Sequence, residues 1–186
     1  ESLTGVTTFL IDEKIDTGAL LMQDKISIKD YENAGDLHDK LLHIGAPLII
    51  KTLINLIKGN LRPKKQYLLK NLNKAPKLTS QNTRINWSMN LLQINNLIRG
   101  LSPFPGAWSE YSINKEINRI KIFKAKIIIK NHDYTINSII IEDGNIYITH
   151  KDGLLNCIEI QLPNKKRMAG KALLNGYIFP KNTLIL

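Results

Sequence analysis

Cysteine is almost absent from this chain, since Cys157 is the only one among 186 residues. One cysteine excludes an internal disulfide, and the apolar strand pattern around Cys157 predicts a buried thiol rather than a nucleophile. A chain without disulfides favours a reducing compartment. We therefore expect the cytoplasm, or an organellar matrix if the source is a eukaryote.

Long apolar runs and metal-ligand pairs are also missing. No apolar run reaches the roughly 18 to 20 residues that span a membrane, and no signal-like segment opens the chain, which reads as a piece of something longer. His38 and His43 are five residues apart and face opposite sides of a helix, whereas zinc-binding helices place ligands at i and i+4. We expect neither a membrane segment nor a metal site.

Acidic side chains are scarce outside the first third of the chain. Residues 1–58 hold six basic and nine acidic side chains, residues 59–118 hold nine and two, and residues 119–186 hold eleven and five, so the net charges are −3, +7 and +6. This asymmetry indicates an anionic partner for the last two thirds, with nucleic acid first and an anionic membrane second. The abundance of Ile, Asn and Lys also fits a base-composition bias, and composition alone supports both explanations equally.

A short apolar strand at residues 6–11 runs directly into an acidic loop, residues 12–18, and a second strand follows at residues 20–28. The first strand is apolar throughout, which predicts burial on both faces, as in the parallel sheet of an α/β domain. Carboxylates on a tight loop after such a strand are typical of binding sites in α/β proteins. A solvated acidic hairpin is the alternative, and spacing alone favours it.

The length of the chain favours two domains. Residues 31–58 have apolar positions every three or four residues and predict a long helix, or a helix bent at Pro47, that is capped by Asn33 or Asp36 and ends at Gly59. After it, a stretch with two prolines and no acidic residue carries Lys64, Lys65, Lys70, Lys74 and Lys77. We expect the end of an α/β domain at 1–60, a linker at 61–84 and a second domain at 85–186.

The second domain is expected to be β-rich. A helix over residues 89–99, capped by Ser88 and stopped by Gly100, precedes strands at 119–129, 139–142, 146–150 and 154–162, and a short helix at 170–175 follows. Short strands at this spacing predict a small barrel of the oligonucleotide-binding type. Trp87, Phe104 and Trp108 are expected to be buried and to hold this domain on the first.

Cations in the second domain follow one strand. Basic and apolar residues alternate there, which predicts a cationic row on one face, and a basic cluster follows later. The predicted phosphate track consists of Arg119, Lys121, Lys124, Lys126, Lys165, Lys166 and Arg167. Aromatic residues are sparse around it, which argues against sequence-specific recognition of a single strand.

Several motifs together resemble one enzyme family. They are residues 4–7 (TGVT), the loop 12–18 with its DTG, 37–41 (LHDKL), 84–87 (RINW), 98–103 (IRGLSP), 105–108 (PGAW), 166–168 (KRM) and 175–176 (NG). In this order and register the chain resembles the C-terminal part of the methionyl-tRNA formyltransferase family, which belongs to the folate-dependent formyltransferases. The resemblance implies a Rossmann-like formyltransferase domain, then a linker and a barrel-like domain that helps to hold tRNA.

The resemblance also implies a reaction and a site. Family members move a formyl group from 10-formyltetrahydrofolate to the amino group of methionyl initiator tRNA, with an Asn, a His and an Asp around the formyl carbon. Asp16 matches the Asp, whereas the Asn and His would lie before Glu1, so residues 1–186 alone are expected to be nearly inactive. Main-chain groups of Asp12, Glu13, Lys14 and Ile15 match the folate pocket, no metal is implied, and a monomer is expected. A sugar-nucleotide formyltransferase and a non-catalytic RNA-binding module are the alternatives.

Overall fold

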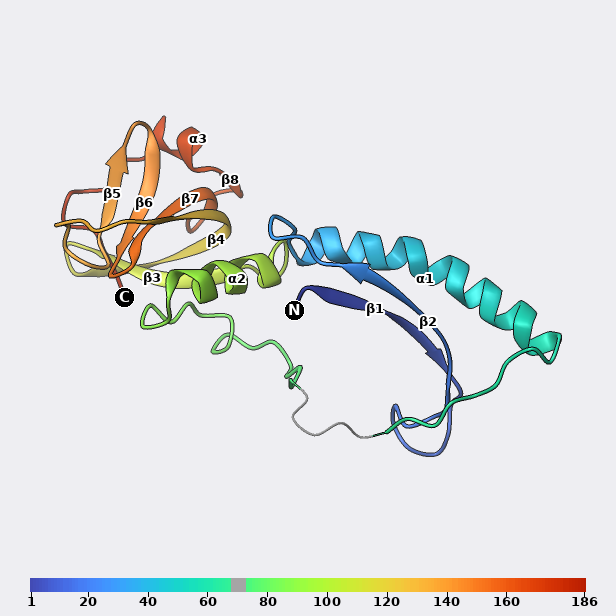
Figure 1. Ribbon diagram of the computed structural model, residues 1–186. Helices are drawn as coiled ribbons and strands as arrows, with labels where there is room; N and C mark the ends of the chain where they lie inside the picture. Colours follow the sequence, from blue (N-terminus) through green and yellow to red (C-terminus); the bar gives the residue numbers. More distant parts are fainter. Residues whose placement is uncertain (68–72) are drawn as a thin grey trace. The chain divides into compact units, whose positions relative to one another are not determined.

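The computed structural model describes residues 1–67 and 73–186, which form two compact units, Glu1–Pro76 and Lys77–Leu186 (Figure 1). The division between the units falls within residues 61–84, the range that the sequence assigns to a linker. Lys70, one of the lysines of the predicted linker, lies outside the described residues.

The first unit contains a β-hairpin with a helix along one face. Strands β1 (Leu3–Phe9) and β2 (Leu20–Ser27) pair antiparallel, and α1 (Ala34–Ile57) packs against both (Figure 1). Alternate residues of β1 are half-buried, and those between them are exposed. The prediction of a strand buried on both faces is therefore wrong for the described chain, because β1 belongs to a hairpin that α1 covers on one side only.

The ends of α1 agree with the sequence pattern. Asn33 Oδ1 accepts hydrogen bonds from the amides of Gly35 and Asp36 at 2.7 and 3.1 Å, and Asp36 accepts from the Asn33 amide at 3.0 Å. Both predicted capping residues thus act together in one capping box. Gly59 follows the C-cap with φ of +66°, a conformation that glycine adopts without strain.

The exposed face of α1 is strongly apolar. Leu42, Ile50, Leu53 and Ile57 are each more than half exposed, whereas Thr52 is buried and its hydroxyl lies 3.0 Å from that of Thr8 on β1. By length and composition, α1 is apolar enough to cross a membrane. Lys40 and Lys51 interrupt its apolar positions, so the expectation of no unbroken apolar run of that length stays a prediction, and the core helix of a soluble protein can have the same composition.

In the second unit, α2 (Leu91–Leu101) begins and ends later than predicted. Asn90 is its cap instead of Ser88, because Asn90 and Gln93 form a capping box while both the amide and the hydroxyl of Ser88 donate to Asn86 Oδ1. Gly100 lies inside the helix. The helix ends one residue later, before Ser102 and a proline, which disfavours the helical conformation in the residue that precedes it.

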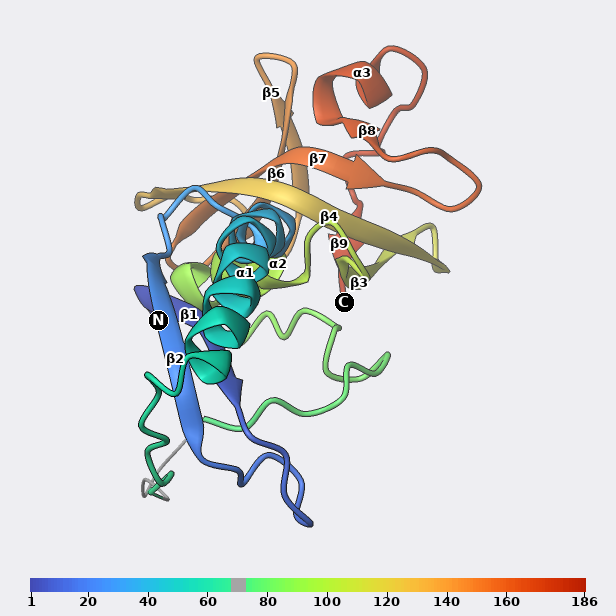
Figure 2. The ribbon, with the colours of Figure 1, turned by 90° about the vertical axis from the view of Figure 1, so that its right-hand side faces the viewer.

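One curled antiparallel sheet forms the rest of the second unit (Figure 2). Its strands are β3 (Ala107–Ile113), β4 (Glu116–Ile129), β5 (Ile139–Glu142), β6 (Asn145–His150), β7 (Gly153–Gln161) and β9 (Leu184–Ile185), in the order β5-β6-β7-β4-β3-β9, with β8 (Met168–Ala169) beside β7 and α3 (Gly170–Leu174) following it. The Ile185 amide donates to Asn137 O at 2.7 Å and the Ile139 amide to Thr183 O at 3.0 Å. The two edges of the sheet therefore meet, and the predicted β-rich domain is confirmed.

Two of the three aromatic residues that were expected to hold the domains together are buried inside the second unit. Trp87 donates to Ser109 Oγ at 2.9 Å, and Trp108 donates to Ser80 O at 2.9 Å. Phe104 is 84% exposed, so the prediction of its burial is wrong. The reason is local, because Phe104 lies in a turn between two prolines, and the core residues Leu101 and Ala107 stand three positions away on either side.

Candidate functional site

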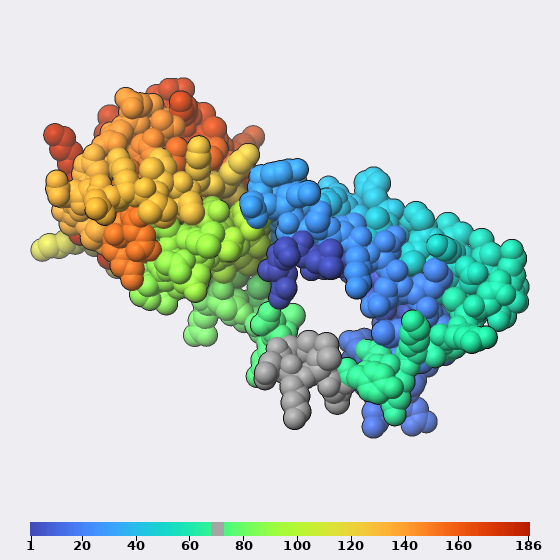
Figure 3. Space-filling model, viewed as in Figure 1, coloured from blue at the N-terminus to red at the C-terminus, as the bar shows by residue number. Residues whose placement is uncertain are grey.

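The acidic loop that follows β1 projects from the hairpin (Figures 1 and 3). Asp12 Oδ1 accepts hydrogen bonds from the Lys14 amide at 3.0 Å and from Thr17 Oγ1 at 2.7 Å. An aspartate that accepts from the amide two residues later forms an Asx turn. Asp12 therefore shapes the loop with its own carboxylate, a role that the sequence prediction of a folate-pocket residue did not include.

Asp16 lies at the tip of this loop with its side chain exposed and a φ of +57°. Its carbonyl accepts from Gln66 Nε2 at 3.0 Å, and Gly18 O accepts from the same nitrogen at 2.6 Å. Gly18 itself is buried so tightly that an added Cβ would lie 1.5 Å from Leu10 O. Gln66 and Gly18 thus fix the backbone on which the Asp16 carboxylate is presented.

The other predicted loop residues are exposed to solvent. Glu13 and Lys14 are exposed, and the exposed fraction of Ile15 is 90%. The structure therefore places the five predicted residues 12–16 on one short, tethered loop, in which the Lys14 amide and the Asp16 carbonyl are already hydrogen-bonded within the chain. Among the described residues, no group of three or more His, Cys, Asp or Glu side chains could hold a metal ion.

The cationic row in the second unit depends on a β-bulge in β4. Between Ile122 and Ala125 the pairing with β7 is interrupted by a bulge in which Phe123 on β4 and Ile158 on β7 have no partner, so the register is the same on both sides. Ile120 and Ile122 on one side of the bulge, and Ala125 on the other, all pack in the core. Without the bulge, strict alternation would turn the cations after Phe123 to the opposite face from those before it. The bulge therefore places Arg119, Lys121, Lys124 and Lys126 on one face.

The predicted phosphate-binding cations differ in how strongly other groups hold them. Lys121 Nζ donates to Pro105 O at 3.0 Å, and the Arg119 guanidinium lies 3.9 Å from the centre of the Trp108 ring. Arg167 forms a bidentate pair with Glu159, at 2.7 and 2.6 Å. Lys124, Lys126 and Lys166 are exposed, and Lys165 Nζ lies 6.0 Å from the Tyr177 ring. The Arg167 guanidinium is thus already paired with a carboxylate, a contact that the sequence did not reveal.

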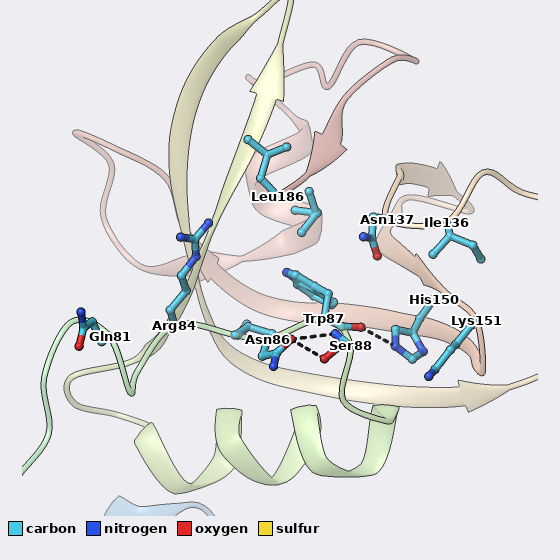
Figure 4. Close-up of a pocket in the computed structure, with 12 residues that line it drawn as sticks. Gln81, Arg84, Asn86, Trp87, Ser88, Ile136, Asn137, His150, Lys151 and Leu186 are labelled. Carbon is cyan, nitrogen blue, oxygen red and sulfur yellow. Dashed lines mark hydrogen bonds between the residues drawn. The ribbon is translucent and has the colours of Figure 1, made fainter. Parts of the chain in front are cut away.

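A further hollow of about 580 Å³ lies within the second unit and was not predicted (Figure 4). Arg84 and Lys151 line it together with His150, which is buried. The Asp152 amide donates to His150 Nδ1 at 3.1 Å, so Nε2 donates to Trp87 O at 3.1 Å. His150 therefore bridges two backbone segments and has a structural role. The walls of this hollow come from segments far apart in sequence, and for that reason no local motif indicates it.

Burial raises the pKa of the Cys157 thiol to about 12. The thiolate is the reactive form, so almost none is present at neutral pH. We expect native protein to remain unmodified by a maleimide reagent at pH 7.5, and denatured protein to take up one label, as measured by mass spectrometry. Rapid labelling of the native chain would contradict the buried-thiol interpretation.

Comparison with known families places these features in context. The model of the formyl transferase C-terminal domain matches residues 77–178, which is more than half of the chain. The chain therefore belongs to the formyl transferase family.

Individual relatives narrow this assignment. The methionyl-tRNA formyltransferase of Flavobacterium johnsoniae is 42% identical over 179 residues, which cover 96% of this chain and 57% of the relative. The chain thus spans little more than half the length of this relative, and the sequence resemblance to methionyl-tRNA formyltransferases is confirmed.

Solved structures show a related fold. An N-formyltransferase from Helicobacter canadensis, solved with folinic acid and dTDP-3-aminofucose, is 26% identical with a TM-score of 0.60, over 84% of this chain and 56% of that chain. HypX from Aquifex aeolicus has a TM-score of 0.65 at 16% identity, over 94% of this chain and 30% of that chain, and shows the likeness of fold alone.

Proposed function

We propose that this chain is part of an enzyme that transfers a formyl group from 10-formyltetrahydrofolate to the amino group of methionyl initiator tRNA. The similarity to methionyl-tRNA formyltransferase over 96% of the chain carries the proposal. Two physical features support it. One is a carboxylate-bearing loop whose backbone is tethered, and the other is a cationic face on a separate β-rich domain.

The reaction requires proton transfer as well as charge stabilisation. The amine nitrogen adds to the formyl carbon, the bond from that carbon to the folate N10 breaks, and the proton lost by the amine ends on N10. In this proposal the Asp16 carboxylate orients the amine and relays its proton. The resemblance assigns stabilisation of the developing oxyanion to the Asn and His that residues 1–186 do not supply.

We further propose that the first unit belongs to a Rossmann-like catalytic domain. The apolar side chains exposed on α1, together with Phe9 at the end of β1 and Ile11 after it, would then be covered by the additional length that the relatives have. The curled sheet of the second unit would act as an oligonucleotide-binding-type barrel that holds tRNA. The complete enzyme would be monomeric and would work in the cytoplasm or an organellar matrix.

A sugar-nucleotide formyltransferase is the second candidate. The structural likeness to the Helicobacter canadensis enzyme, solved with an amino-sugar nucleotide, favours it. The charge distribution favours tRNA, because the last two thirds of the chain carry a net +13 and a small soluble nucleotide needs no broad cationic surface. The third alternative, a non-catalytic RNA-binding module, does not account for the first unit. There, a tethered loop presents a carboxylate from a hairpin that α1 covers on one side only.

Salt dependence of tRNA binding separates the candidates. The chain 1–186 is expected to bind tRNA with an affinity that falls steeply between 50 and 200 mM salt, since each neutralised phosphate contributes about −0.9 to the slope of log K against log salt. The measurement is a filter-binding or fluorescence titration at several salt concentrations, with dTDP-linked amino sugar as the competing ligand. Undetectable tRNA binding, combined with binding of the sugar nucleotide, would replace this proposal by the second candidate.

A further inference from the structure

Phe104 is exposed on a turn that is held in place from both sides. The Gly106 amide donates to Leu101 O at 2.8 Å, and prolines fix φ on either side of Phe104. The ring is 84% exposed, which leaves a large apolar surface in water. A rigid turn that presents an aromatic ring in this way is suited to a ligand that covers the ring face.

The turn is also attached to the cationic strand. Lys121 Nζ donates to Pro105 O at 3.0 Å. Gly106 has a φ of +84° and lies so close to Phe123 that an added Cβ would be 2.7 Å from the ring. The bulge residue of β4 therefore packs directly under the turn, so that Phe104 keeps a defined position beside the cationic row.

Two hollows meet at the cations next to Phe104. One, of about 320 Å³, is lined by Phe104, Trp108, Arg119 and Lys121 among others. The other, of about 270 Å³, is lined by Arg119 and Lys121 together with the last residue of β7 and the residues that follow it. Both cations therefore stand between the hollow beside the aromatic ring and a second hollow along the sheet.

We propose that Phe104 stacks on an unpaired base of RNA, and that Arg119 and Lys121 bind the phosphates flanking that nucleotide. The inference rests on the proposed function, which makes RNA the substrate, and adds to it a binding site for one unpaired nucleotide. Proteins bind single strands by this combination of stacking rings and a cationic groove, and every base offers a π-face. Inside a duplex, neighbouring base pairs cover both faces of each base, so the site discriminates unpaired from paired RNA.

Charge complementarity favours RNA over a protein partner. An apolar protein surface placed over Phe104 would bury Arg119 and Lys121 in the same contact, and interface cores are depleted in unpaired charge. RNA carries one phosphate anion per nucleotide, so a single ligand can contact both the Phe104 ring and the two cations.

The test uses the whole chain with an eight-nucleotide single-stranded RNA and a blunt 12-base-pair RNA duplex. Phe104→Ala is expected to weaken binding of the single strand by roughly 5- to 100-fold, because base stacking on an aromatic ring is lost. Duplex binding and the salt slope of single-strand binding should not change, since no phosphate contact is removed. The thermal melting temperature, which an exposed side chain affects little, serves as the control for folding.

A second variant gives a direct signal. Phe104→Trp should retain the affinity for the single strand, and the fluorescence emission of the added indole should fall on binding, measured as a difference against unaltered protein.

The outcomes distinguish the stacking site from the proposed function. If Phe104→Ala loses affinity for the single strand and the duplex equally, or loses none, the stacking site is overturned, while steep salt-dependent binding by the unaltered chain still supports the proposed function. A change of oligomeric state in sedimentation, with RNA binding intact, would show a protein interface instead. Absence of RNA binding by the unaltered chain would overturn both proposals.

Discussion

Replacing Asp16 by asparagine in a complete formyltransferase that contains this chain is expected to lower kcat by about 10²- to 10³-fold, the usual loss when one acid–base or charge-stabilising group is removed. Asparagine keeps the size of the side chain but cannot take the proton of the attacking amine. The backbone should not move, because the Asp16 carbonyl, and not its carboxylate, accepts the hydrogen bond from Gln66. Single-turnover formylation of methionyl-tRNA measures the effect on the chemical step.

Asp12→Asn is the matched control on the same loop. The asparagine Oδ1 can still accept from the Lys14 amide and from Thr17 Oγ1, so the loop keeps its shape while losing the same charge. We expect less than about a tenfold loss, since no proton passes through this side chain. Equal losses in the two variants would mean that the loop acts through its total charge, and the specific assignment to Asp16 would be wrong.

Structure that is decided within a few neighbouring residues could be predicted from the sequence. The cap of α1 was predicted as Asn33 or Asp36 because capping residue types stand directly before an apolar periodicity, and the two form one capping box. Four strands of the second unit, β4 to β7, were predicted for the same reason, since alternation and turn residues mark them locally, whereas β3, β8 and β9 were not predicted. The cap of α2 was placed wrongly at Ser88, because Asn86 competes for that hydroxyl and its amide.

Features that depend on distant residues could not be predicted. Gln66 holds a loop carbonyl 50 residues away in sequence, and no local pattern identifies such a partner. The bulge at Phe123 was also missed, although the row of four cations requires it, because register is decided by pairing with β7. The residue types of the candidate site were therefore visible in the sequence, whereas the contacts that support them were not.

Charge reversal at Lys121, Lys124 and Lys126 is expected to weaken tRNA binding by the chain about 100-fold or more at 0.1 M salt. Each lost phosphate contact lowers the magnitude of the salt slope by about 0.9, so three contacts account for about 2.7. The three lysines can contact the same stretch of tRNA, because the bulge places them on one face. Titrations with initiator and elongator tRNA at several salt concentrations measure both the affinity and the slope.

The matched control reverses Lys151, Lys171 and Lys181, which are exposed, belong to the same unit and lie outside β4. Since the net charge changes equally in both triple variants, a difference in slope reports local phosphate contacts rather than the total charge of the protein. The β4 variant should weaken both tRNAs in the same proportion, because contacts with the phosphate backbone carry no direct sequence information. A selective loss of binding to initiator tRNA would instead show that these lysines take part in its recognition. Equal slopes in the two triple variants would show that the lysines of β4 do not contact phosphate.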